Sequence, residues 1–198
     1  MSSDGRHRGE LDQYAATASE LVEHGRYGEA LEYLLLVLQE RPDDPGALWE
    51  LAMAYSNLGH NTEALAVLEQ LNSRIPSNAE LRTAMGCVQL RLGRYQDAKI
   101  NLLRAYAFDR ENAVILRNLG HAYQGLGDAA SAEQAFLAAH EMDSDDNRTV
   151  HALARFYMSK PDLRMAEHWV KLLLSRERDG EAARDGERWL LRIQSGWA

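Results

Sequence analysis

Five basic side chains in the second half of the sequence have the types and spacing needed to bind an anion. Arg117 and His151 occupy positions that differ by 34, and so do His121 and Arg155, whereas Arg148 precedes Arg155 by two helical turns. Arginine binds carboxylates through paired hydrogen bonds, and histidine adds a donor whose charge changes near neutral pH. If segments separated by this interval lie side by side, these residues form one cluster. That cluster predicts a binding site for an acidic segment of a partner protein.

Two interpretations of this cluster remain open. Like charges that are grouped together repel one another and oppose the compact state. A bound anion would offset this repulsion, which explains a basic cluster in a chain whose formal net charge is −8. Alternatively, carboxylates from the turns, such as Asp145 and Asp146, already neutralise the arginines. A metal shared by His121 and His151 is disfavoured, because the adjacent arginines repel a cation and no carboxylate stands at a matching position.

Other chemistry-bearing residues do not form a catalytic pattern. The sequence shows no nucleophile near a base, no paired carboxylates, no phosphate-binding glycine loop and no metal-ligand spacing. Arg91, one turn after Cys87, would favour the thiolate of this single cysteine, but an inert apolar role is the simpler interpretation. We therefore expect no enzyme activity, no catalytic residues, no cofactor and no metal.

Trp49 and Met53 form a second candidate contact, of apolar character. They are one helical turn apart, and an aromatic ring beside a flexible thioether suits an apolar anchor from a peptide. The alternative is that Trp49 packs between neighbouring helices.

A repeating element with the same period must position all of these side chains. Within each period the apolar residues follow helical spacing in two segments, which predicts a pair of amphipathic helices. Glycine at Gly25, Gly59, Gly93 and Gly127 is expected to end the first helix of a pair. Small residues at two fixed positions of each period let the paired helices approach closely. Bulky residues recur at the positions beyond this contact, and Gln89 is the exception to that pattern. One of these small positions holds alanine five times, at Ala30, Ala64, Ala98, Ala132 and Ala166.

A 34-residue unit of this kind, as in ALWELAMAYSNLGHNTEALAVLEQLNSRIP at 47–76, resembles the tetratricopeptide repeat. The resemblance covers residues 11–180 and implies an all-α fold, a right-handed α-solenoid whose first helices line a concave groove. Thr17 and Arg82 depart from it, because the family usually places apolar residues there. The expected repeats are 11–44, 45–78, 79–112, 113–146 and 147–180.

The resemblance further implies that ligands lie in the concave groove, which adds Thr83 and Cys87 to the partner-binding candidates. Some members of the family grip the C-terminal carboxylate of heat-shock chaperones with a lysine and asparagine pattern. That pattern is incomplete in this chain, where only Asn118 and Arg148 match it.

The two ends of the chain lie outside the five repeats. Residues 1–10 are expected to be a disordered or frayed tail, and 181–198 to be a helix that caps the apolar face of the last repeat. Trp189 and Trp197 are expected to pack on the fifth repeat. The alternative is an exposed aromatic edge that mediates self-association.

Composition disfavours several classes of function. A net charge of −8 disfavours nucleic-acid binding, and no apolar run approaches the roughly 20 residues of a membrane helix. The first ten residues lack the apolar core of a signal peptide, and a single cysteine forms no internal disulfide. We therefore predict a cytoplasmic location and no membrane insertion.

The favoured function is a non-catalytic adaptor or chaperone that holds an apolar and acidic segment of a partner in the groove. The alternatives are a self-assembling homo-oligomeric scaffold and a chaperone for a bacterial secretion substrate. Arg117→Glu with Arg155→Glu is expected to abolish capture without changing stability. Capture is expected to strengthen below about pH 6.5, where His121 and His151 would both gain charge.

Overall fold

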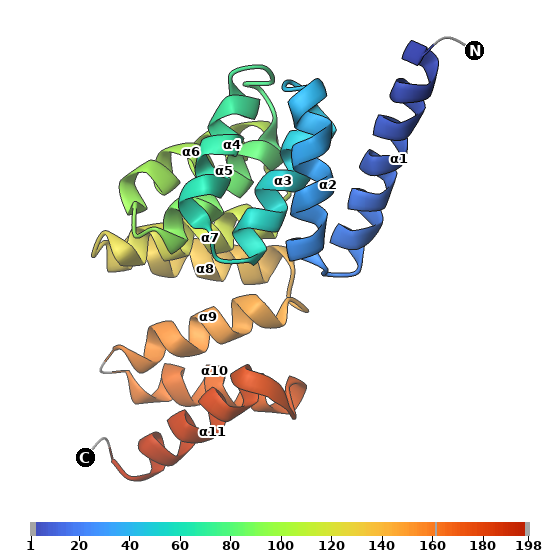
Figure 1. Cartoon of the computed structure of the whole chain (residues 1–198). Helices are drawn as coiled ribbons and strands as arrows, with labels where there is room; N and C mark the ends of the chain where they lie inside the picture. Colours follow the sequence, from blue (N-terminus) through green and yellow to red (C-terminus); the bar gives the residue numbers. More distant parts are fainter. Residues whose placement is uncertain (1–2, 161, 197–198) are drawn as a thin grey trace. The chain divides into compact units, whose positions relative to one another are not determined.

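The computed structural model describes residues 3–160 and 162–196, with side chains from residue 8 onward, and this part of the chain is helical without strands (Figure 1). The fold is therefore all-α, as predicted. Two compact units divide at Phe108. The N-terminal unit (residues 1–108) contains α1 (Ser3–Glu23), α2 (Tyr27–Glu40), α3 (Pro45–Asn57), α4 (Asn61–Asn72), α5 (Ala79–Arg91) and α6 (Tyr95–Phe108). The C-terminal unit (residues 109–198) contains α7 (Ala113–Gly125), α8 (Ala129–Met142), α9 (Asn147–Met158), α10 (Leu163–Arg176) and α11 (Gly180–Gln194).

Local sequence signals set the helix ends. Asp or Asn side chains accept a backbone N–H at the start of several helices, as Asn112 Oδ1 does from Val114 at α7. Between paired helices the backbone turns through glycines with positive φ, such as Gly59 at 82° and Gly127 at 78°. Glycine adopts this left-handed conformation at little cost, which confirms the predicted helix stops.

Close helix pairing explains the repeating small residues. The five alanines of the period have no exposed surface. A Cβ added at Gly120 of α7 would lie 2.5 Å from two ring carbons of Phe136 in α8. In the same way, a Cβ at Gly86 of α5 would lie 2.6 Å from Leu102 Cγ in α6. The large side chain of one helix thus occupies the space left by the small residue of its partner.

Two departures from the repeat pattern, Arg82 and Gln89, meet at Asn101. Asn101 Nδ2 donates to Gln89 Oε1 at 3.0 Å, and Arg82 Nη1 donates to Asn101 Oδ1 at 3.2 Å. Arg82 also donates to the carbonyl of Pro76. Gln89 and Asn101 are both buried, so their mutual hydrogen bond offsets the cost of placing polar groups in the core.

The N-terminal segment differs from the frayed tail expected for residues 1–10, because α1 begins at Ser3. Once the apolar residues of α1 hold the helix on α2, each preceding turn extends it at little cost, and no proline interrupts this segment. No atom outside the helix lies within 4 Å of a Cβ placed at Gly9, so this turn gains little from packing.

At the other end, α11 packs on α9 and α10 within the C-terminal unit. Ala183 and Gly186 form its buried side. Trp197 lies outside the described residues. The division of the chain into five 34-residue repeats stays a prediction.

Candidate functional site

The predicted basic cluster comes together on α7 and α9 of the C-terminal unit. Arg155 Nη2 lies 3.3 Å from His121 Nδ1, so residues one period apart do touch. The cluster surrounds a pocket of about 340 Å³. The pocket is lined by Arg117, His121, Asn147, Arg148, His151, Ala152, Arg155, Glu177 and Ala182.

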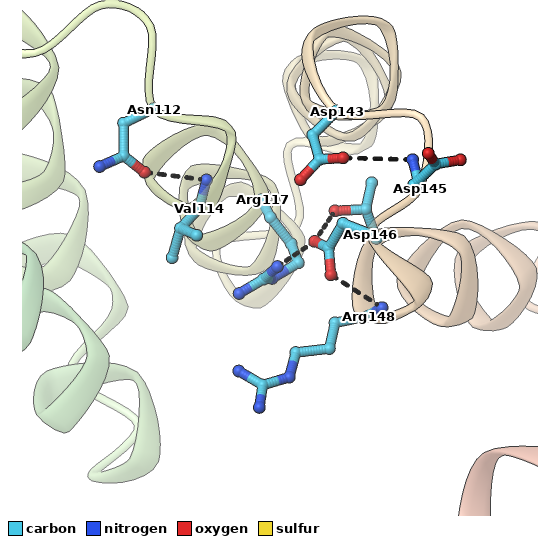
Figure 2. Close-up of polar contacts among 8 residues, drawn as sticks. Asn112, Val114, Arg117, Asp143, Asp145, Asp146 and Arg148 are labelled. Carbon is cyan, nitrogen blue, oxygen red and sulfur yellow. Dashed lines mark hydrogen bonds and ion pairs between the residues drawn. The ribbon is translucent and has the colours of Figure 1, made fainter.

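Arg117 is committed to a structural contact. Its guanidinium donates through Nη1 to the carboxylate of Asp146, and only 8% of Arg117 is exposed (Figure 2). Asp146 also accepts from the Thr149 hydroxyl at 2.6 Å and from the Arg148 backbone N–H at 3.1 Å, which caps α9. Burial opposes ionisation of Asp146, but these hydrogen bonds and the charge of Arg117 hold its pKa below the usual value.

The neutralisation interpretation is therefore correct for Arg117. Asp145, the other carboxylate considered for this role, forms a different contact: its backbone N–H donates to Asp143 Oδ1. The contact between Arg117 and Asp146 argues against the expectation that Arg117→Glu with Arg155→Glu leaves stability unchanged, because the substitution at position 117 would place two carboxylates in a buried contact.

His121 is neutral near physiological pH. Burial lowers its pKa to about 4, and the charges of Arg155, Arg117 and His151 add to the effect. Its ring also packs edge-on against Phe136, with 5.0 Å between ring centroids. The expectation that His121 gains charge near pH 6.5 is therefore wrong. Because Arg155 Nη2 is a donor, Nδ1 of His121 accepts and the ring proton lies on Nε2.

His151 contacts two residues of α11. Its Nε2 lies 3.1 Å from Asp185 Oδ2, and its ring stacks on Trp189 at 5.3 Å between centroids. Asp185 also accepts from Arg188. Burial opposes the charge of Asp185, but Arg188 and His151 keep its pKa below the usual value.

Sequence analysis missed Asp185, although a signal for it was present. Asp185 follows His151 by one full period, and Trp189 follows Arg155 by the same interval. Extending the period by one further unit would have placed both residues of α11 beside α9. Trp189 is half-buried against the core of the C-terminal unit, in keeping with the packing expectation rather than the exposed edge.

Arg148 and Arg155 differ from the other basic residues of the pocket. Both are exposed, and among the described residues neither forms an ion pair with a carboxylate. Figure 2 shows the Arg148 side chain directed away from Asp146, although its backbone N–H contacts that residue. Two guanidinium groups are thus available to a ligand.

The candidates in the N-terminal unit are not brought into this pocket. Trp49 and Met53 are half-buried and pack against an apolar cluster that includes Leu48, Leu68 and Leu81. Thr83 Oγ1 donates to the Ala79 carbonyl at 2.8 Å, and Cys87 is half-buried.

The described residues contain no group of three or more His, Cys, Asp or Glu side chains placed to hold a metal ion. None of their helices is both long enough and apolar enough to cross a membrane.

Solved structures of several proteins share this fold. A thermophilic TPR protein from Thermus thermophilus, TTC0263, is 24% identical, with a TM-score of 0.76 over 91% of this chain and 99% of that one. MamA (41-end) from Desulfovibrio magneticus RS-1 is 23% identical, with a TM-score of 0.76 over 85% and 95%. Pseudomonas aeruginosa pilF is 18% identical, with a TM-score of 0.77 over 96% and 86%. At these identities the likeness concerns the fold alone.

Sequence comparison identifies the family. No curated protein shows a significant match to the chain. Two models of the tetratricopeptide repeat match residues 21–86 and 83–147, and together they span well over half of the 198 residues. This chain therefore belongs to the tetratricopeptide repeat family.

Proposed function

We propose that this protein is a non-catalytic interaction module, an adaptor or chaperone, that captures an acidic segment of a partner protein. The observation that carries the proposal is the pair Arg148 and Arg155. Both line the pocket of the C-terminal unit, and among the described residues neither has a carboxylate partner.

The spacing of the two arginines suits an extended acidic segment. They are seven residues apart on α9, which corresponds to about 10 Å along the helix axis. Side chains on one face of an extended chain recur every two residues, about 7 Å apart. Carboxylates two or four residues apart in the partner, about 7 or 13 Å, therefore lie on either side of this spacing and within reach of the two long arginine side chains. Each charged hydrogen bond would contribute about 1.5–3 kcal/mol.

An apolar contact on the N-terminal unit is a separate part of the proposal. Trp49 and Met53 are only half-buried, so part of each side chain remains available for a partner. Aromatic and thioether surfaces often anchor apolar side chains at protein interfaces.

Capture of partners from extracts of the native host tests this function. The variant Arg148→Gln with Arg155→Gln removes both charges and keeps Arg117 and its buried contact. The matched control is Arg164→Gln with Arg178→Gln, two exposed arginines that do not line the pocket. Cross-linking and mass spectrometry identify the proteins captured by the wild-type protein, the pocket variant and the control variant.

We expect the pocket variant to lose a partner that both the control and the wild-type protein retain. Equal capture by the pocket variant would reject the proposed site. Light scattering on the purified protein tests the alternative of a self-assembling scaffold, which requires the wild-type protein to be an oligomer.

A further inference from the structure

Most charges around the pocket are paired. Asp146 holds Arg117, and Asp185 contacts both His151 and Arg188. Among the described residues, the unpaired charges that line the pocket are therefore the guanidinium groups of Arg148 and Arg155 and one carboxylate, that of Glu177.

Glu177 is held in place without being neutralised. It forms the C-terminal cap of α10, where its backbone N–H donates to the Leu173 carbonyl at 2.9 Å. Its Oε1 accepts from Asn147 Nδ2 at 2.7 Å. Asn147 is uncharged, and no cation in the described part of the chain forms an ion pair with Glu177.

The imidazole of His121 adds no charge to this balance at neutral pH, because burial and the adjacent arginines lower its pKa to about 4. Two unpaired positive charges and one unpaired negative charge thus leave the pocket with about one uncompensated positive charge.

From this arrangement we infer that Glu177 weakens the binding of doubly charged phosphate groups in the pocket more than the binding of singly charged carboxylates, and so shifts the pocket's selectivity toward carboxylates. The repulsion between the Glu177 carboxylate and a bound anion scales with the charge of the anion. A phosphoryl group carries about −1.5 to −2 charges at neutral pH, so Glu177 opposes its binding more strongly than that of a carboxylate. The inference builds on the proposed function, since it names the chemical group of the partner that enters the pocket.

Two capped tripeptides test the selectivity directly. One is acetyl-Gly-Glu-Gly-amide, and the other has phosphoserine in place of glutamate. Each is titrated into the ¹⁵N-labelled full-length protein, and the backbone amide shifts of Arg148, Ala152 and Arg155 report binding. At about pH 8 the phosphoryl group is a dianion and the glutamyl side chain a monoanion, so the charges of both ligands are well defined.

We expect removal of the Glu177 charge to strengthen binding of both peptides, and of the phosphoserine peptide more. Glu177→Gln keeps an oxygen that can accept from Asn147 but removes the charge. Because Coulomb energy scales with ligand charge, Glu177→Gln should raise the affinity for the phosphoserine peptide about tenfold and the affinity for the glutamyl peptide about threefold. The matched control, Glu187→Gln, removes an exposed carboxylate of α11 that does not line the pocket and should change neither affinity.

Equal effects of Glu177→Gln on both peptides would overturn the inference, as would a larger effect on the glutamyl peptide or binding of neither peptide. These outcomes are distinct from failure of the proposed function. If partner capture survives loss of Arg148 and Arg155 while the peptides show the expected selectivity, only the proposed function fails. If capture needs both arginines but Glu177→Gln is without effect, only the selectivity fails.

Discussion

Arg117 of α7 donates to Asp146, the residue that caps the N-terminus of α9, so one buried ion pair joins two helices and shapes one wall of the pocket. Arg117→Gln should destabilise the C-terminal unit by about 2–3 kcal/mol, because Asp146 would keep its charge but lose its cation. Urea denaturation followed by circular dichroism measures this. Arg148→Gln is the control, since its exposed guanidinium has no carboxylate partner among the described residues, and its unfolding midpoint should not move. Equal midpoints for both variants would contradict a structural role for Arg117.

Acidification should destabilise the fold through His121. Its folded pKa of about 4 lies below the ordinary value of about 6.5, so between these pH values the unfolded chain binds a proton that the folded chain does not. Stability is therefore lost as pH falls through this window, by up to about 2 kcal/mol between pH 7 and pH 5. His121→Asn keeps a hydrogen-bond acceptor but does not titrate, so its unfolding free energy should vary less over the same range. Identical pH profiles for the variant and the wild-type protein would refute this assignment.

Two glycines on helix faces should respond differently to alanine. At Gly120 the added Cβ meets the fully buried ring of Phe136, which has no room to move, and we expect a loss of about 2 kcal/mol. At Gly186 the nearest atom is Leu174 Cδ2 at 2.9 Å, and Leu174 is only half-buried. Its side chain can rotate, and alanine favours the helix by about 1 kcal/mol. The melting temperature of Gly120→Ala should therefore lie well below that of Gly186→Ala. The reverse order would argue against tight pairing of α7 and α8.

The buried pair Gln89 and Asn101 should show strong coupling. Gln89→Leu leaves Asn101 Nδ2 without its acceptor, which costs about 1–3 kcal/mol. Replacing both residues by leucine removes the polar pair and should cost less than Gln89→Leu alone. A double-mutant cycle of unfolding free energies measures the coupling, and additive effects would mean that the pair contributes no mutual stabilisation.

Trp189 should stabilise the monomer through its contact with His151. Trp189→Ala removes the stacked ring and part of the core of the C-terminal unit, so we expect a loss of about 2 kcal/mol. Leu191→Ala is the control on the same helix. Because Leu191 is 66% exposed, this substitution should hardly change the unfolding free energy. Light scattering should give the same mass for both variants. Conversion of a wild-type dimer to a monomer by Trp189→Ala alone would favour self-association instead.

Local and periodic features of the sequence predicted most of the fold. Gly59 and Gly127 mark turns because positive φ is cheap only without a side chain, and the alanine series marks places where helix backbones meet. The same period predicted the contact between His121 and Arg155, since residues at one position of successive repeats lie side by side. These inferences needed only backbone geometry, which short-range chemistry determines.

Tertiary structure decided which charges remain available. Asp146 stands two residues before Arg148, yet its carboxylate reaches across to Arg117 of another helix, while Glu177 enters the pocket from the end of α10. Ion pairing and burial depend on side-chain rotamers and on distances between helices, and the period of the sequence specifies neither. The sequence by itself determined a basic cluster on paired helices. Only the packed helices left Arg148 and Arg155 without an ion pair among the described residues, because Asp146 and Asp185 pair with other basic side chains and the Glu177 carboxylate accepts from Asn147.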